Sequence, residues 1–251
     1  MMKKIIFLFA LIFISTVAAF ATTNEKLNYV VTYKWGLIQK DAGEVEITKK
    51  PKNDGYELKL VAKTKPWADK IYKLRDTLIS VTEKEHYRPL HYTYIAHEKN
   101  KYRKDDIAFT YTGNSVKGKS EKYKENKNGD IEHSSQILEG STPVYDMLSV
   151  YFFLRDIEYA NLKPGETVRA TIFSGSKEEF LTVRCEGKET IQLRDKSEHE
   201  AWHILFKFTQ KGGTKSSDDI NCWVSTKEPH IPLLIVGNLP IGQVRVNYQA
   251  P

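Results

Sequence analysis

Apolar residues recur at every second position in short runs along most of this chain, as at Tyr29, Val31 and Tyr33. Side chains with this period lie on one face of a β-strand. Turn signals such as Asn-Asp-Gly at 53–55 and Thr-Gly-Asn at 112–114 separate the runs. Strands separated by turns every 8–12 residues or so are typical of antiparallel sandwiches and barrels. The sequence therefore predicts a mainly β fold with an antiparallel barrel-like or curved-sheet architecture.

The first 21 residues have the pattern of a cleaved Sec-type signal peptide. Lys3 and Lys4 precede an apolar run at 5–14, and Ala-Phe-Ala at 19–21 supplies a cleavage site. The apolar run is shorter than the roughly 20 residues needed to span a bilayer. We therefore expect no transmembrane segment. The cleavage point has no cysteine to which a lipid anchor could be attached, so no such anchor is expected. The mature protein is expected to be soluble and periplasmic.

Residues 22–251 are enough for a single β-rich domain, possibly with two halves that meet near 156–165. The formal charge of +6 falls to +4 without Lys3 and Lys4, and lysines alternate with glutamates along the chain. This mild charge on an exported protein argues against a nucleic-acid partner. Lipid head groups or glycans of the envelope stay possible as partners. The pattern does not indicate an oligomeric state.

The two cysteines, Cys185 and Cys222, each share a strand face with apolar neighbours. Both side chains are therefore expected to face a core. An oxidising compartment would permit a disulfide between them. Two buried free thiols would give the same sequence pattern, so both alternatives stay open.

The segment 144–155 departs from the strand pattern. Apolar residues recur there with helical spacing, as at Val144, Leu148 and Phe152. Thr142 and Pro143 offer a cap and a proline suited to the first helical position. We predict a buried central helix that plugs the sheet. The alternative is a helix that covers a ligand cavity as a lid.

The motif His199-Glu200-x-x-His203 matches a zinc hydrolase signature if it is helical. However, apolar residues alternate with period two from Trp202 to Phe208. In a strand the two histidines would be roughly 13 Å apart, too far to share one zinc ion. A strand is the favoured interpretation, and a metal site at His199 and His203 is the alternative.

The segment 98–127 contains nine basic residues with interleaved tyrosines. Aromatic side chains among cations can stack on sugars. Acidic residues dilute the positive charge, and a solvated hairpin face explains the pattern adequately. Glycan binding by exposed Trp, Tyr and Lys stays a further alternative.

Several landmarks along the chain together resemble a known family. They are Leu27-x-Tyr29-x-Val31-x-Tyr33-Lys34-Trp35-Gly36, Tyr72-x-x-Arg75-Asp76-Thr77, Tyr145-Asp146-Met147-Leu148-Ser149, Tyr151-Phe152-Phe153-x-Arg155, Trp223-Val224-Ser225, Ile231-Pro232-Leu233 and Ile241-Gly242-Gln243-Val244-Arg245. In this order they resemble the exported bacterial family known only as domain of unknown function 3108. The resemblance implies a β-rich periplasmic protein without an established activity, so it supplies no catalytic residues.

Three charged residues in these landmarks, Asp76, Asp146 and Arg155, stand among apolar residues. Asp146 and Arg155 are nine residues apart, so on a helix they cannot reach each other, and Arg155 is expected to pair with Asp76. A ligand head-group site is the alternative. The candidate ligand-binding residues are Trp35, Asp76, Asp146, Tyr151 and Arg155.

The function that these observations favour is non-enzymatic binding of an apolar or amphipathic envelope molecule, such as a lipid or a lipid-linked glycan. No catalytic residue and no cofactor are expected. The alternatives are a metal-dependent hydrolase and a glycan-binding protein.

Overall fold

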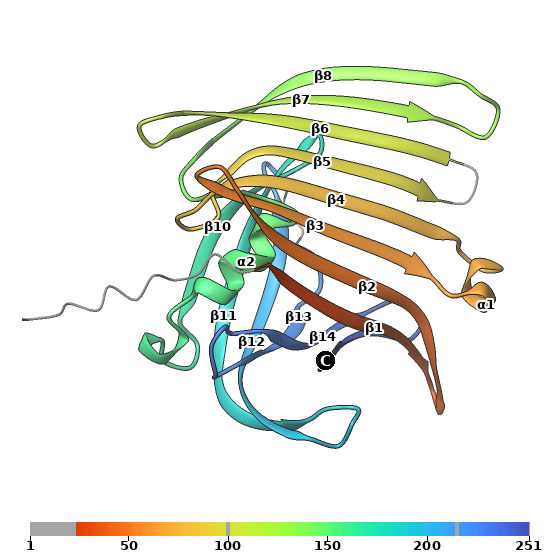
Figure 1. Cartoon of the computed structure of the whole chain (residues 1–251), viewed down its shortest axis with the longest axis vertical. Helices are drawn as coiled ribbons and strands as arrows, with labels where there is room; N and C mark the ends of the chain where they lie inside the picture. Colours follow the sequence, from red (N-terminus) through yellow and green to blue (C-terminus); the bar gives the residue numbers. More distant parts are fainter. Residues whose placement is uncertain (1–23, 99–100, 214–215, 251) are drawn as a thin grey trace, which may run out of the picture.

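The computed structural model describes residues 24–98, 101–213 and 216–250, in which fifteen strands form one sheet (Figure 1). The expected signal peptide at 1–21 lies outside these residues. The first half supplies β1 (Glu25–Trp35), β2 (Ile38–Lys52), β3 (Gly55–Thr64), β4 (Leu74–Glu83), β5 (Pro89–Glu98), β6 (Lys101–Thr112), β7 (Ser115–Glu125) and β8 (Ile131–Ser141). The second half supplies β9 (Val144–Asp146), β10 (Thr167–Ser174), β11 (Lys177–Gln192), β12 (Glu198–Gln210), β13 (Ile220–Ser225), β14 (Pro232–Asn238) and β15 (Gln243–Gln249).

The described helices are short: α1 (Pro66–Asp69), α2 (Ser149–Asp156) and the 3-10 turn η1 (Tyr159–Asn161). Among the described residues, none of them has the length and apolar character required to cross a membrane.

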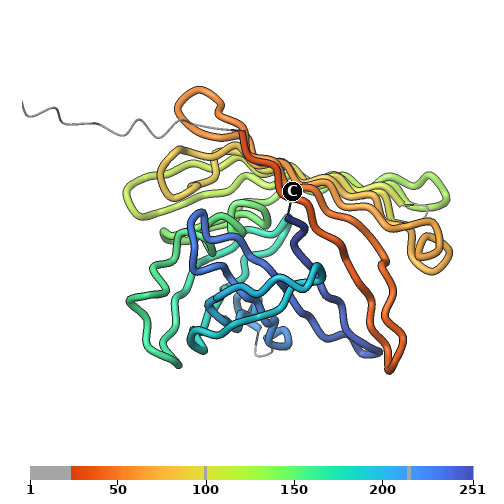
Figure 2. Tube along the Cα trace, turned by 60° about the horizontal axis from the view of Figure 1, so that its bottom comes forward, coloured from red at the N-terminus to blue at the C-terminus, as the bar shows by residue number. Residues whose placement is uncertain are grey.

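The strands follow one another as antiparallel neighbours from β1 to β8 and again from β10 to β15. The last strand returns to the first, because β15 pairs with β1 along seven residue pairs that include Val31 and Val246. The two edges of the sheet are β8 and β9, which are consecutive in the chain. Figure 2 shows the strands of the first half curving over those of the second. The predicted barrel-like β architecture is confirmed as a nearly closed barrel.

The predicted turns connect the strands where the sequence placed them. Asn53 has a φ of 48° in the turn between β2 and β3, and Gly113 has a φ of 57° between β6 and β7. Glycine and asparagine adopt this left-handed region more readily than other residues. These residues therefore fix the register of both hairpins.

Two hydrophobic clusters fill the space between the halves, and α2 contributes to both. Phe152 packs with Tyr29 and Leu58 in the first cluster. Val150 and Leu154 belong to the second. Five of the eight residues of α2 are buried. A helix that packs on two sides in this way favours the packed-core interpretation over the lid.

The helix begins later than the sequence predicts, at Ser149 instead of 144. Residues 144–146 form β9 and pair in parallel with Thr171–Phe173 of β10. Asp146 Oδ1 then accepts hydrogen bonds from the backbone amides of Leu148 and Ser149, both at 2.7 Å. The pairing with β10 is a long-range contact, so helical spacing in the sequence could not show it.

Cys185 and Cys222 are free and buried, so the disulfide alternative is wrong. Cys185 lies opposite Ile204 on β12, and Ile204 in turn lies opposite Cys222 on β13. Two strand spacings separate the cysteines by roughly 10 Å. A disulfide needs Cα atoms within about 7 Å.

Candidate ligand-binding pocket

The turn between β10 and β11 inserts against the inner face of β6 and β7. Ser120 donates a hydrogen bond of 2.8 Å to the carbonyl of Gly175 at the tip of this turn. Gly175 has a φ of 64°, and a side chain there would collide with the Asp105 carboxylate. Glycine therefore allows the turn to approach the sheet closely.

A pocket of about 440 Å3 lies between this turn and the sheet. Its walls come from β4, β5, β6 and β7 on one side, and from Met147 and the β10–β11 turn on the other. The lining residues are Asp76, Leu78, Tyr92, Tyr94, Arg103, Asp105, Lys122, Met147, Ser174, Gly175, Ser176, Lys177 and Glu179. Small-molecule sites commonly measure about 300–1,000 Å3.

Asp76 is one of two buried carboxylates that line this pocket, together with Asp105. Tyr94 donates a hydrogen bond of 2.9 Å to its Oδ2. Its Oδ1 is buried and has no hydrogen-bond partner of good geometry among the described residues. Burial raises the pKa of Asp76, and the Tyr94 hydroxyl only partly offsets this effect. A buried oxygen without a donor is unfavourable, so a ligand that brought a donor here would be stabilised.

Two cationic side chains, Arg103 and Lys122, also line the pocket. Arg103 Nε donates a hydrogen bond of 2.9 Å to Asp105 Oδ1, and this buried partner raises the pKa of the guanidinium. Lys122 makes one long hydrogen bond of 3.5 Å to the Ser176 hydroxyl. Burial lowers the pKa of Lys122, and the neighbouring Arg103 charge lowers it further. Lys122 is thus available to an anionic or acceptor group.

The pocket also has an apolar wall, formed by Leu78, Tyr92 and Met147. Met147 remains partly exposed there although it follows three buried residues of β9. Thioether side chains adapt to ligands of irregular shape. The site combines a buried acceptor, a cation and an apolar wall, which suits a ligand that has both polar and apolar parts.

Only one of the predicted ligand-binding residues, Asp76, lines this pocket. Asp146 is fully buried beneath it, where Ser80 donates a hydrogen bond of 2.5 Å to its Oδ2. Burial raises the pKa of Asp146 to about 6. Its hydrogen bonds hold the start of α2, and it does not line this pocket.

The expected ion pair between Arg155 and Asp76 is not formed. Arg155 instead pairs with Glu25 of β1, with N–O distances of 2.8 and 3.0 Å. Burial tends to raise the pKa of Glu25, but Arg155 and Lys49 outweigh this and hold it below its ordinary value. The strand pairing brings Glu25 beside α2, which sequence spacing could not reveal.

Tyr151 and Trp35 lie elsewhere. The Tyr151 hydroxyl is 2.6 Å from that of Tyr29 inside the barrel, and burial raises the pKa of both groups. Trp35 is exposed at the end of β1. The structure therefore does not gather the five predicted residues into one site.

The His199-Glu200-x-x-His203 motif lies in β12, so the helix that a zinc site needs is not formed. His203 stacks on Trp223 with ring centroids 4.6 Å apart and contacts Asn221. His199 contacts Ser197. In the part of the chain that the structure describes, no three His, Cys, Asp or Glu side chains converge as a metal site.

The sequence interpretation missed Arg103, Asp105 and Lys122 as site residues. Asp105 shares strand parity with Ile107 and Phe109, which face the core. A charge on an apolar face was the available signal. The interleaved lysines and glutamates of 98–127 obscure this signal, because their pattern is also that of a solvated hairpin face.

Comparison with known proteins identifies a family and a similar fold for most of the chain, but it assigns no activity. The family model described as "Protein of unknown function (DUF3108)" matches residues 28–248. No curated protein matches the sequence. A similar solved structure is titled "Crystal Structure of Beta-barrel-like Protein of Domain of Unknown Function DUF1849 from Brucella abortus". The two chains are 11% identical with a TM-score of 0.55, and the match covers 89% of this chain and 95% of the other. At this identity the likeness concerns the fold alone.

Proposed function

The chain belongs to the DUF3108 family of proteins of unknown function, and from this premise we propose that it is an exported binding protein for an amphipathic envelope molecule. The proposed role is non-enzymatic, and the ligand is a lipid or a lipid-linked glycan. The signal-peptide pattern at 1–21 supports export to the periplasm. The observation that carries the binding role is the pocket around Asp76.

The ligand is proposed to enter the pocket with its polar head group. An acceptor at Asp76 and a cation at Lys122 would meet donor and anionic groups of such a head. Leu78 and Met147 would contact the first apolar atoms beyond it. A volume of about 440 Å3 suits a head group or a short glycan better than a whole diacyl lipid.

The packing around α2 argues against a purely apolar ligand inside the barrel. Phe152 and Leu148 are each about 1% exposed and fill the space between the halves. Acyl chains would therefore extend away from the pocket and not into the core.

Native mass spectrometry of the protein purified from an envelope fraction tests this proposal. We expect a bound molecule that is retained by Lys117→Ala and lost from Lys122→Ala. Both lysines are on β7, but Lys117 is exposed and pairs with Glu139, whereas Lys122 lines the pocket. Absence of any bound molecule, or equal retention by the two variants, would contradict the proposal.

Glycan binding on the outer face is a second candidate function. His97, Tyr102, Tyr123 and His133 form a ladder across β5–β8, with ring centroids 4.9–5.7 Å apart. Lys104 lies beside the ladder in a shallow pocket of about 390 Å3. Aromatic rings beside a cation can stack on sugar rings. A glycan array should show binding that Tyr123→Ala removes, and no binding by the native protein would exclude this role.

A further inference from the structure

Two neighbouring turns at one end of the barrel expose large apolar side chains. The first joins β1 to β2, where Leu37 is fully exposed and Trp35 is 57% exposed. The second joins β14 to β15, where Ile241 is 64% exposed. We call this surface the apolar tip, and it consists of Trp35, Leu37, Ile38, Leu239 and Ile241. Exposed apolar side chains grouped in this way commonly mark an interaction site.

The two turns are adjacent because β1 pairs with β15. Lys34 lies opposite Gln243 at the end of this ladder. Tyr33 extends from β1 and donates a hydrogen bond of 2.8 Å to the carbonyl of Ile241. The apolar side chains of the tip therefore belong to one surface, although about 200 residues separate them in the sequence.

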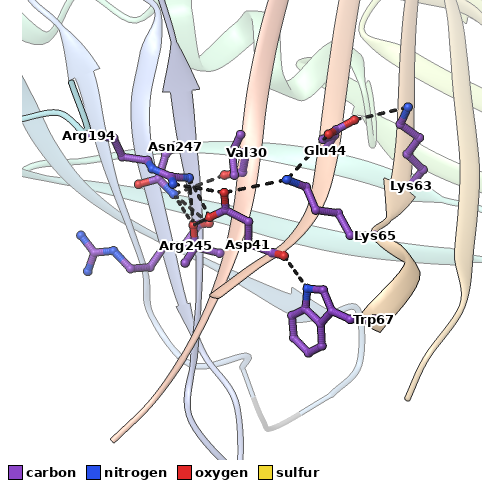
Figure 3. A network of polar contacts seen from close by, with 10 residues as sticks. Val30, Asp41, Glu44, Lys63, Lys65, Trp67, Arg194, Arg245 and Asn247 are labelled. Carbon is purple, nitrogen blue, oxygen red and sulfur yellow. Dashed lines mark hydrogen bonds and ion pairs between the residues drawn. The ribbon is translucent and has the colours of Figure 1, made fainter. Parts of the chain in front are cut away.

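A polar network fixes the base of the tip (Figure 3). Asp41 of β2 accepts hydrogen bonds of 2.8 and 3.1 Å from Arg194, which comes from the β11–β12 turn. Trp67 donates a hydrogen bond of 2.7 Å to the carbonyl of Asp41. Asn247 of β15 donates hydrogen bonds of 3.2 Å to the Val30 carbonyl and to the Thr32 hydroxyl of β1. The strands below the tip are thus tied to two other parts of the chain, which holds the tip in one arrangement.

Positive charge borders the tip. Lys34 and Lys40 stand on the strands that lead into and out of the first turn. Neither lysine has a carboxylate within ion-pair distance among the described residues, and Lys40 lies 4.5 Å over the Trp67 ring. The nearby Asp41 is already paired with Arg194 and Lys65. The surface therefore presents apolar side chains between two uncompensated cations.

We propose that the apolar tip docks onto an anionic lipid surface. Leu and Ile side chains would enter the acyl boundary, and Trp35 would lie at the head-group level that tryptophan favours. Lys34 and Lys40 would contact anionic head groups, each contributing to attraction at the surface. A lipid surface suits this tip because its apolar side chains are exposed at two neighbouring turns and are bordered by lysines without ion-pair partners among the described residues.

This inference is independent of the proposed pocket ligand, since no residue of the tip lines the pocket. A protein that binds nothing in its pocket could still dock on membranes. Equally, a protein that binds a ligand in its pocket need not dock on membranes. The test of either proposal can therefore fail while the other succeeds.

Vesicle flotation with the mature protein tests the inference. We expect the native protein to float with vesicles of phosphatidylglycerol and phosphatidylcholine, and less with phosphatidylcholine alone. Binding should weaken as salt is raised, because the lysine contribution is screened. Leu37→Ser should reduce the partition coefficient about tenfold or more, as expected when one buried leucine side chain is removed from the apolar phase.

Ile137→Ser is the matched control. Ile137 of β8 is also more than half exposed but lies outside the tip. It should leave vesicle binding unchanged, and the melting temperatures of both variants should match the native protein. The inference is overturned if the native protein fails to float, if binding ignores lipid charge, or if the two variants lose binding equally.

Discussion

At the scale of single residues, Asp146 shows how one carboxylate can define the start of a helix at an energetic cost. It accepts hydrogen bonds from the backbone amides of Leu148 and Ser149 at the start of α2, and one from the Ser80 hydroxyl. These donors stabilise the charge, yet burial dominates and raises its pKa from 3.8 to about 6. Between these two values the folded protein binds more protons than the unfolded chain. The contribution of Asp146 to stability is therefore present below about pH 4 and is lost as pH rises through 6.

Asp146→Asn should remove this pH dependence. The amide oxygen can still accept from Leu148 and Ser149, while no charge is buried above pH 6. We expect the free energy of unfolding of the native protein, relative to this variant, to fall by about 2 kcal/mol between pH 4.5 and 7. Urea unfolding at both pH values measures it, and the difference cancels contributions from other carboxylates. A difference that stays constant with pH would contradict the assignment.

At the scale of elements, the contacts of α2 bear on whether this helix is a fixed plug of the barrel or a movable lid. Phe152 stacks near Tyr87 with ring centroids 4.9 Å apart and also contacts Tyr151. A movable lid would belong to the less stable part of the structure. These ring contacts favour the plug, so we predict that α2 is a fixed element.

Phe152→Ala should therefore destabilise the protein by about 3–5 kcal/mol, as large-to-small changes at packed aromatic sites do. For a chain of this size, 3 kcal/mol lowers the melting temperature by roughly 6–12 °C. Differential scanning calorimetry measures it. A decrease of less than about 2 °C would favour the lid.

A second element that joins the two halves of the barrel is the end of β10, which packs against β7. We call this contact the seam. Phe173 is fully buried and packs against Gly118 of β7, where an added Cβ would be 2.7 Å from the ring. Gly118→Ala should cost about 1–3 kcal/mol, because overpacking displaces the ring or the strand. Gly237→Ala is the control, since a Cβ there would meet nothing within 4 Å. Chemical denaturation should separate the two variants, and equal stabilities would contradict this account of the seam.

At the scale of the whole molecule, one buried cation connects parts that are distant in the chain. Arg155 at the end of α2 pairs with Glu25 at the start of β1 and donates a hydrogen bond of 3.0 Å to the carbonyl of Pro229. Its side chain is 5% exposed. This arrangement fixes the first strand, the helix and the loop before β14 relative to one another.

Glu25→Ala should destabilise the whole barrel by about 3–5 kcal/mol, because it leaves a buried guanidinium without its anion. Glu46→Ala removes the carboxylate of an exposed pair with Lys26 and should cost less than about 1 kcal/mol. Urea unfolding at neutral pH compares them. Similar costs for the two changes would show that the Arg155 pair has no special role.

The sequence by itself determined the local structure of this protein. Period-two alternation and turn residues identified the strands, placed Cys185 and Cys222 on core faces, and indicated a strand at His199–His203. These features follow from the φ and ψ preferences and side-chain periodicity of neighbouring residues, which act within a few positions. The family resemblance extended this to the whole chain.

Only the tertiary structure decided which distant groups meet. It paired Arg155 with Glu25 instead of Asp76, delayed the helix to Ser149 by pairing β9 with β10, and assembled the pocket from four strands and a turn. Each of these contacts depends on strand order and on closure of β15 against β1. Side-chain periodicity shows which face a residue occupies but not which element lies opposite, because that choice is made by the packing of the whole chain.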